Sequence, residues 1–248
     1  MPIKLITNFG KSEYDSRKNL KRKILATSAL GTAVAFGIIS HKQGFRISNL
    51  SKVAMKDWAL FKITPKSLVI EEKEIITLAG GSVIGGLAGG AIFDKKSNFK
   101  AKLKEALNQM LGNVLVPVGC VGLTSRWYKK NEIKILSKVP QIKKSGKVYT
   151  LMNRGLKAIP PVFITGVALA VGIITGNKVS NFINEKLYKQ KVDRDIKATD
   201  FAPHVDDLCL AVTLMAPGTP VGKVIARTIP AFLTVPGYQT GIAQEYSH

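Results

Sequence analysis

The segment Leu78–Phe93 constrains the fold of this chain more than any other, because it contains six glycines and no charged residue. Residues four apart lie one above the other on a helix, so this spacing places small residues on two adjacent helix faces. The two rows are Gly81, Gly85 and Gly89, and Ser82, Gly86 and Gly90. In water, each glycine costs a helix about 1 kcal/mol relative to alanine. In a bilayer, bare faces let two helices approach closely, so the segment predicts a membrane-embedded packing helix.

Apolar residues make up 46% of the 248 residues, and they gather in charge-free blocks between lysine-rich segments. A soluble helical domain would instead mix charged and apolar residues at helical spacing. The pattern predicts an all-α integral membrane protein with about four embedded helices, amphipathic surface helices and a broken C-terminal hairpin. The embedded blocks are 24–40, 75–93, 106–124 and 158–176. Residues 208–236 suit either a re-entrant hairpin or a packed cap.

The predicted organisation has three parts. They are a basic N-terminal segment 1–23, a helical membrane domain 24–236 and a C-terminal tail 237–248. Residues 24–40 fit a cleaved signal peptide as well as an anchor, since Ala33-Val34-Ala35 matches a small-x-small cleavage site. The long basic leader and the apolar run beyond Ala35 favour an uncleaved anchor.

The segments outside the embedded blocks carry weaker helical signals. Residues 47–61 predict an amphipathic surface helix, and Thr64-Pro65 predicts the start of a helix that runs to residue 93. The most basic segment, 125–157, predicts a water-exposed loop with short helices. Pro160-Pro161 predicts the start of the next helix, and an amphipathic continuation of that helix is expected over 177–192.

The net charge of +21 suits either nucleic acid or anionic lipid as a partner. The basic residues flank the apolar blocks, as they do in membrane proteins. The chain also lacks the basic–aromatic ladder of single-strand binders. We therefore expect anionic membrane lipids as partners, and a basic nucleic-acid-binding protein is the alternative. No pattern in the sequence identifies a small-molecule substrate.

Charge counts bear on how often the chain crosses the membrane. Four crossings with a cytoplasmic N-terminus place 18 basic residues inside and 17 outside, which gives no bias. If the block 106–124 instead dips in and returns, the counts become 22 and 13, which the positive-inside rule favours. The length of this block and the Trp127-Tyr128 pair after it favour a crossing. We predict a multi-pass protein with a cytoplasmic N-terminus and leave the number of crossings open.

The stretch Phe-Ala-Pro-His-Val-Asp-Asp, residues 201–207, is the one segment that looks like an active-site motif. It resembles the Pro-His-Pro-Asp-Asp-Glu zinc motif of the LmbE/PIG-L deacetylase family. The resemblance implies that His204 and Asp207 bind zinc and that Asp206 acts as a base. The departures from the motif are Val205 and Leu208. A membrane-bound metal-dependent hydrolase is therefore the alternative function.

The same stretch also has a purely structural interpretation. Asp206 or Asp200 would cap a helix, and His204 would make a polar contact. We therefore expect a non-enzymatic protein without a cofactor or a bound metal, which acts through glycine-faced helix packing or assembly in the membrane.

Gly172 and Gly176 offer a bare face on another helix, so packing within the chain is the simpler interpretation of the glycine rows. Assembly into a homo-oligomer, around a pore for example, is the alternative. The two cysteines, Cys120 and Cys209, lie in apolar blocks without metal-ligand spacing. We expect both to be buried as small apolar residues.

Overall fold

The computed structural model describes residues 3–44, 72–189, 194–204 and 230–244, with side chains from residue 16 onward. Within these ranges all of the regular secondary structure is helical, without strands, which confirms the predicted all-α class. The described ranges contain six α-helices. They are α1 (Ile3–Lys42), α3 (Glu72–Phe93), α4 (Phe99–Leu107), α5 (Val116–Leu136), α6 (Lys147–Tyr188) and α10 (Val235–Ile242). The short segments are the 3-10 helices η2 (Lys96–Asn98) and η4 (Ala198–His204) and the π-helix η3 (Asn108–Leu115).

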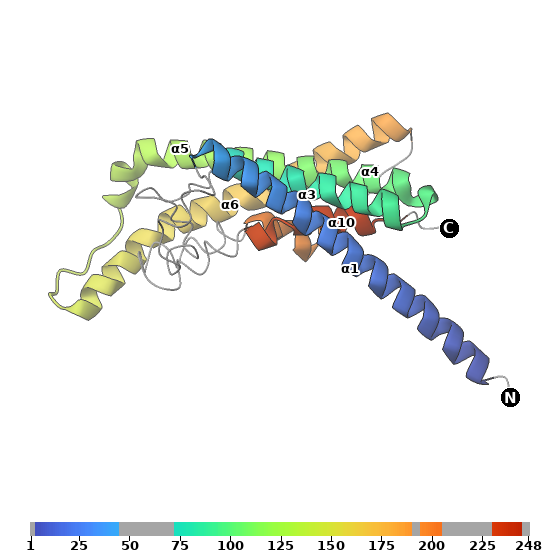
Figure 1. Cartoon of the computed structure of the whole chain (residues 1–248). Helices are drawn as coiled ribbons and strands as arrows, with labels where there is room; N and C mark the ends of the chain where they lie inside the picture. Colours follow the sequence, from blue (N-terminus) through green and yellow to red (C-terminus); the bar gives the residue numbers. More distant parts are fainter. Residues whose placement is uncertain (1–2, 45–71, 190–193, 205–229, 245–248) are drawn as a thin grey trace.

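Four long helical rods run back and forth along one bundle, as Figure 1 shows. The first is α1, the second is α3, and the fourth is α6. The third is one continuous helical stretch from Lys96 to Leu136, made of η2, α4, η3 and α5. The start of α1, the α3–α4 connection and the end of α6 lie at one end of the bundle. The α5–α6 connection lies at the other end, and the short helix α10 packs on α3.

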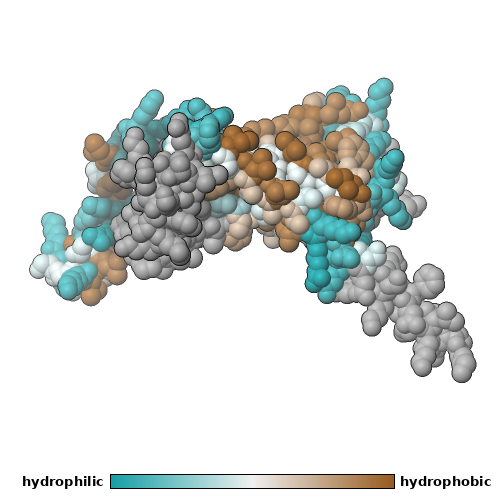
Figure 2. Space-filling view, viewed as in Figure 1, coloured by the Kyte–Doolittle hydropathy of each residue, from teal (hydrophilic) through white to brown (hydrophobic). Residues whose placement is uncertain are grey.

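All four rods are long and apolar enough to span a membrane. Between 28% and 50% of each apolar stretch is buried inside the protein, so at least half of each is exposed or only half-buried. Figure 2 shows a hydrophobic band in the middle of the molecule and hydrophilic ends. Exposed side chains of these rods include Leu30, Val34 and Ile38 on α1, Ile84 and Ile92 on α3, and Phe163 and Val167 on α6. An apolar waist between polar ends is what contact with lipid requires, so these are the properties of a multi-pass helical membrane protein.

The block 106–124 lies in the middle of the third rod and does not dip in and return. At one end of this rod, Lys102 binds Asp94 just after α3. Further along it, Gly122 lies against Glu72 at the start of α3. The rod therefore runs the length of α3 in the opposite direction. The third rod is thus one of four helices that could each cross a membrane, and the near-equal basic counts leave the orientation a prediction.

Two helices are longer than the sequence predicts. Pro160 and Pro161 lie inside α6, which begins at Lys147 and continues to Tyr188, so the predicted helix start at these prolines is wrong. The prolines remove the N–H donors for the carbonyls one turn earlier. Those carbonyls, at residues 156 and 157, lie just before the apolar block 158–176. The predicted loop 125–157 is likewise helical except for residues 137–146, because α5 continues to Leu136.

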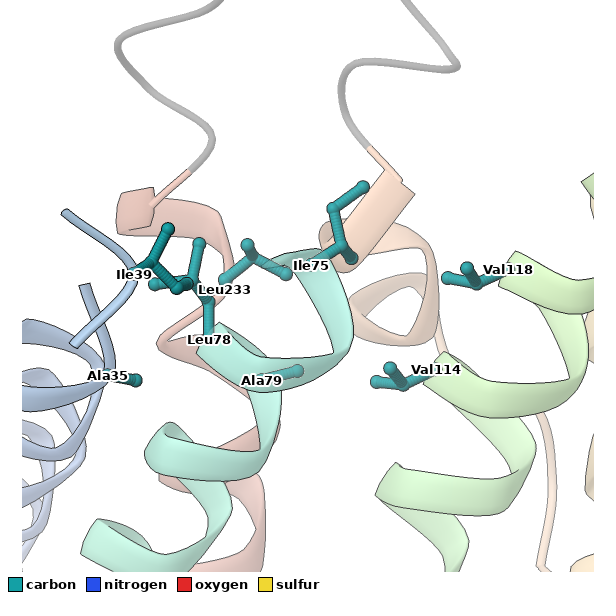
Figure 3. Packing of buried hydrophobic residues seen from close by; sticks show 8 residues of the cluster. All are labelled: Ala35, Ile39, Ile75, Leu78, Ala79, Val114, Val118 and Leu233. Carbon is teal, nitrogen blue, oxygen red and sulfur yellow. The ribbon is translucent and has the colours of Figure 1, made fainter. Parts of the chain in front are cut away.

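The best-packed hydrophobic cluster lies where α1, α3 and the third rod meet (Figure 3). It also includes Leu233, just before α10. Its other members are Ala35, Ile39, Ile75, Leu78, Ala79, Val114 and Val118. Alanines hold two of these positions, which lets the helices come close. The cluster therefore ties the C-terminal part of the chain to three of the four rods.

Several predicted elements lie outside the described residues, namely the surface helix 47–61, the helix start at residue 65 and most of the segment 208–236. The amphipathic continuation of α6 extends to Tyr188, where Lys189 takes a left-handed conformation at the C-cap. Residues 236 and 237, the predicted end of the membrane domain, both lie within α10.

Candidate functional site

The first glycine row of α3 faces α1. A methyl group added at Gly81 would lie 2.6 Å from the Gly31 carbonyl oxygen and 2.7 Å from the Ala35 side chain. Such distances lie well below ordinary contact, so the two backbones touch directly. The row on α3 is Gly81, Gly85 and Gly89, and the facing row on α1 is Thr27, Gly31 and Ala35. Both rows have four-residue spacing, which brings small residues into register along the whole contact.

The second row of α3 faces α10. Its members are Ser82, Gly86 and Gly90, and the facing residues are Gly237, Gly241 and the side chain of Lys102. A methyl group at Gly241 would lie 2.7 Å from the Gly86 carbonyl oxygen. Both small-residue faces of α3 are therefore covered by helices of the same chain.

Ser82 caps the N-terminus of α10. Its hydroxyl accepts a hydrogen bond from the Gly237 N–H at 3.0 Å and donates to the Thr234 carbonyl at 3.0 Å. Thr234 is the N-cap residue of α10, and its own side chain makes no capping bond. The first N–H groups of a helix have no acceptor inside it. The buried hydroxyl of Ser82 on α3 is the acceptor for one of these groups, the Gly237 N–H.

Lys102 holds the C-terminal end of α10. Its side chain is fully buried, and its Nζ donates to the carbonyl oxygens of Gly241 at 2.6 Å and Ala243 at 2.8 Å. A third bond joins Nζ to Asp94 Oδ2 at 2.7 Å. An ammonium group has three donors, so all three are used. A methyl group at Gly90 would lie 2.5 Å from Lys102 Cδ, which means that the absence of a side chain there makes room for the lysine.

Gly172 and Gly176 do not face the glycine rows of α3, contrary to the expected pairing. They contact the third rod instead. A methyl group at Gly172 would lie 2.6 Å from Pro117 Cα, and one at Gly176 would lie 2.5 Å from the Gly112 carbonyl oxygen. Gly112 belongs to η3, so this contact joins α6 to the π-helical part of the third rod.

A second polar cluster joins η4 to the third rod. Arg194 Nη2 lies 3.0 Å from Glu105 Oε1 and 2.8 Å from Asp200 Oδ1, and these three side chains are at most 13% exposed. Asp200 Oδ2 also accepts from the Lys197 N–H at 2.8 Å, just before η4. Asp200 thus acts in the way a capping residue does. These buried charges are all paired, as buried charges generally must be, and the pairs connect the segment 194–200 to the third rod.

Amide side chains extend this cluster along η3. Asn113 Nδ2 donates to Asp200 Oδ1 at 2.7 Å and to Gln109 Oε1 at 2.9 Å, and Gln109 Nε2 donates to Glu105 Oε1 at 2.7 Å. Asn184 on α6 donates to Asn108 Oδ1 at 3.0 Å. A π-helical turn widens the backbone and often marks functional positions. Here it directs polar residues of an otherwise apolar block toward α6 and η4.

His204 binds the backbone of the third rod. Its Nε2 lies 2.8 Å from the Asn113 carbonyl oxygen, so this nitrogen is the donor. Asn113 stands four residues before Pro117, and a proline has no N–H to pair with the carbonyl one turn earlier. The buried histidine supplies the missing donor.

Three charged groups outside the rods, Asp94, Arg194 and Asp200, have shifted pKa values. Burial by itself raises the pKa of Asp200, but hydrogen bonds from Arg194 and from the Lys197 backbone outweigh burial and lower it. Burial opposes the charge of Arg194, and its bonds to Asp200 and Glu105 again prevail and raise its pKa. The pKa of Asp94 is lowered in the same manner, mainly by Lys102. All three groups are therefore held in their charged forms.

The proposed zinc ligands are only partly within the described residues. His204 is buried, and Asp206 and Asp207 lie outside the described ranges. No group of three or more candidate metal ligands occurs in the part of the chain that the structure describes. Cys120 is half-buried with a free thiol, and Cys209 is outside the described ranges.

Sequence reasoning missed the partners of the glycine rows. Residues 27, 31 and 35 and residues 237 and 241 share the same four-residue spacing of small side chains. A search for that spacing over the whole chain would have found both partner rows. Comparison with protein-family models, with curated proteins and with solved structures found no match to this chain.

Proposed function

We propose that this protein is a non-enzymatic integral membrane protein that acts through close helix packing within one chain. The observation that carries the proposal is the double coverage of α3. One small-residue face meets α1 and the other meets α10 and Lys102. Packing of this kind produces a rigid unit in lipid, because backbone contact replaces flexible side-chain contact.

Membrane extraction tests the embedding. After cell membranes are isolated, washing with carbonate at high pH or with concentrated salt should leave the protein in the pellet. Detergent should release it. Recovery of a monodisperse, detergent-free protein from the washes would contradict the proposal and would favour the basic nucleic-acid binder.

The oligomeric state tests packing within one chain against assembly. We propose that the glycine rows do not serve a homo-oligomer, because both rows of α3 are already occupied. Light scattering in detergent, corrected for bound detergent, should give the mass of one chain, 26.9 kDa. An oligomer that dissociates when Gly81 is replaced by alanine, while each subunit stays folded, would show that assembly is the role of this row.

The proposed orientation has a cytoplasmic N-terminus and, with four crossings, an α5–α6 connection on the opposite side. Single cysteines at Ser12 and Ser145, in a background without Cys120 and Cys209, report this directly. An impermeant maleimide should label the Ser145→Cys variant in intact cells. It should label Ser12→Cys only after the cells are opened, and the reverse pattern would invert the orientation.

The zinc hydrolase is not favoured by the position of His204. Its Nε2 already donates to the Asn113 carbonyl, so zinc binding at this nitrogen would break that bond and leave the carbonyl unpaired. Zinc content per chain, compared between the unmodified protein and His204→Ala, distinguishes the zinc hydrolase from the non-enzymatic membrane protein. Stoichiometric zinc that is lost in the variant would restore the hydrolase hypothesis.

A further inference from the structure

The α5–α6 hairpin, defined here as Arg126–Lys157, is a strongly basic surface of the described chain. It contains ten basic residues and one acidic residue, Glu132. All ten basic residues are exposed. Among the described residues, Arg126 is the one member of this group that forms an ion pair, with Glu72 at 3.3 Å. The hairpin therefore presents a nearly uncompensated positive surface.

The hairpin is also rich in exposed apolar side chains. Ile133 is 88% exposed and Val148 is 67% exposed, and other exposed members are Trp127, Leu151 and Met152. On α6 the apolar residues 148, 151, 152 and 159 share one side of the helix, whereas Lys147, Arg154 and Lys157 lie on another. This is the pattern of a helix that lies at a boundary between water and oil.

Helix length places this surface beside the membrane. α6 has 42 residues, which at 1.5 Å per residue gives about 63 Å, roughly twice the hydrocarbon thickness of a bilayer. Its first 11 residues precede the apolar block and extend about 16 Å beyond it. Apolar side chains at this distance would face water if the hairpin stood upright. They are covered if the hairpin tilts onto the head groups.

The hairpin is ordered before any partner binds. Asn153 accepts from the Ile142 N–H at 2.8 Å and donates to the Ile142 carbonyl at 2.9 Å, which fastens the loop to α6. Lys144 Nζ lies 5.9 Å from the centre of the Tyr149 ring, which further joins the loop to the helix. A preorganised surface loses little conformational entropy on binding.

We propose that the α5–α6 hairpin is a docking surface for anionic lipid head groups of the leaflet that it faces. This inference rests on the proposed membrane embedding, since the span α6 brings the hairpin to the surface. Exposed lysines and arginines supply the attraction to anionic head groups. The apolar side of α6 enters the boundary between head groups and acyl chains.

The test uses the full-length protein with the Ser145→Cys change and both native cysteines replaced by serine. It carries an environment-sensitive fluorophore at residue 145 and is reconstituted in two kinds of vesicle. One is phosphatidylcholine alone, and the other is equal parts phosphatidylcholine and phosphatidylglycerol. We expect blue-shifted emission, and quenching by head-group nitroxides, in the anionic vesicles. The shift should disappear in about 1 M salt, where screening is nearly complete within a few ångströms.

A charge-neutralised variant and a matched control locate the effect. Changing Lys143, Lys144 and Lys147 to glutamine should lower the ratio of bound to unbound hairpin by roughly fivefold per residue. The control changes three exposed lysines at the other end of α6, Lys178, Lys186 and Lys189, and should leave the ratio unchanged. Equal loss in both variants would overturn the proposal, because it would mean that total charge and not the hairpin governs binding.

Two further outcomes separate this inference from the proposed function. If the protein resists carbonate extraction from both vesicles and emission is the same in both, the embedding stands and the docking surface is wrong. If carbonate strips the protein from both vesicles, the embedding itself fails and the docking proposal fails with it. A blue shift in neutral vesicles that appears only when duplex or single-stranded nucleic acid is added would replace lipid by nucleic acid as the partner.

Discussion

Gly81→Ala is the substitution that most directly tests the contact between α1 and α3. The added methyl would lie 2.6 Å from the Gly31 carbonyl oxygen and 2.7 Å from the Ala35 side chain, whereas ordinary contact begins at 3.4 Å. The helices must therefore separate locally by about 0.8 Å, or the side chains must shift by a similar amount. The Gly31 contact is to backbone, which cannot move without moving the whole helix.

The size of the effect follows from two opposing contributions. Overpacking of a well-packed contact costs about 1–3 kcal/mol. Alanine recovers at most about 1 kcal/mol through its better helix propensity. We expect Gly81→Ala to lower the free energy of unfolding by about 1–2 kcal/mol, since the overpacking cost is the larger contribution.

The neighbouring residue supplies a matched control. A methyl at Gly80 would lie 3.9 Å from Met110 Cε, which is an ordinary contact. Gly80→Ala should therefore be neutral or stabilising by up to about 1 kcal/mol. Unfolding by sodium dodecyl sulfate in mild-detergent micelles, followed by helical circular dichroism, measures both variants. Equal stability of the two variants would refute the direct backbone contact.

A double substitution tests which neighbour resists the methyl. Ala35→Gly removes one of the two close contacts of an alanine at position 81, and the Gly31 carbonyl remains. The pair Gly81→Ala and Ala35→Gly should therefore show a favourable coupling energy of about 0.5–1 kcal/mol, but not full recovery. Strict additivity would mean that the two side chains do not meet.

The polar contacts give three more predictions. Lys102→Met should lower the free energy of unfolding by about 3–5 kcal/mol, because it removes the cationic partner of the Asp94 carboxylate and the donor to two helix-end carbonyls. The exposed Lys100→Met should cost less than about 1 kcal/mol in the same unfolding assay. The lowered pKa of Asp200 means that its ionised form stabilises the fold above the unfolded value of about 3.9, so stability should fall as the pH drops from about 5 through that lowered value. Asp200→Asn should flatten this acid limb of the stability curve. His204→Phe should cost about 1–3 kcal/mol by leaving the Asn113 carbonyl unpaired, and His204→Gln, which retains a donor, should cost less in the same measurement.

The two glycine rows of α3 were predictable because the spacing that defines them is local in the sequence. Four-residue spacing within 78–93 places the small residues on shared faces whatever the surrounding fold. The partner of each face was not predictable from that segment. The pairing of Gly81 with Gly31, instead of with Gly172 or Gly176, depends on which rods lie side by side. That choice is decided by the whole bundle.

The burial of Lys102 could not be predicted from the sequence, for a different reason. Lys102 lies in a basic connection, where a lysine is ordinarily solvated. It is buried because Gly90 leaves room for its stem and because α10 ends at its ammonium group. Both conditions come from segments far away in sequence. The prolines at 160 and 161 led to a different error, because the local rule for helix starts predicts a boundary there whereas α6 continues through both residues.

The capping of α10 has a consequence for how this chain is made. Ser82 precedes the helix end that it caps by 155 residues, and Lys102 precedes its carbonyl partner by 139 residues. All four rods leave the ribosome before α10 does, so during that interval the serine hydroxyl and the lysine ammonium lack these partners in a medium where such groups are costly. Arrival of α10 satisfies both at once. Closure of this part of the bundle therefore waits for the synthesis of α10, and a nascent chain that stops before α10 would leave the serine hydroxyl and the lysine ammonium without these partners.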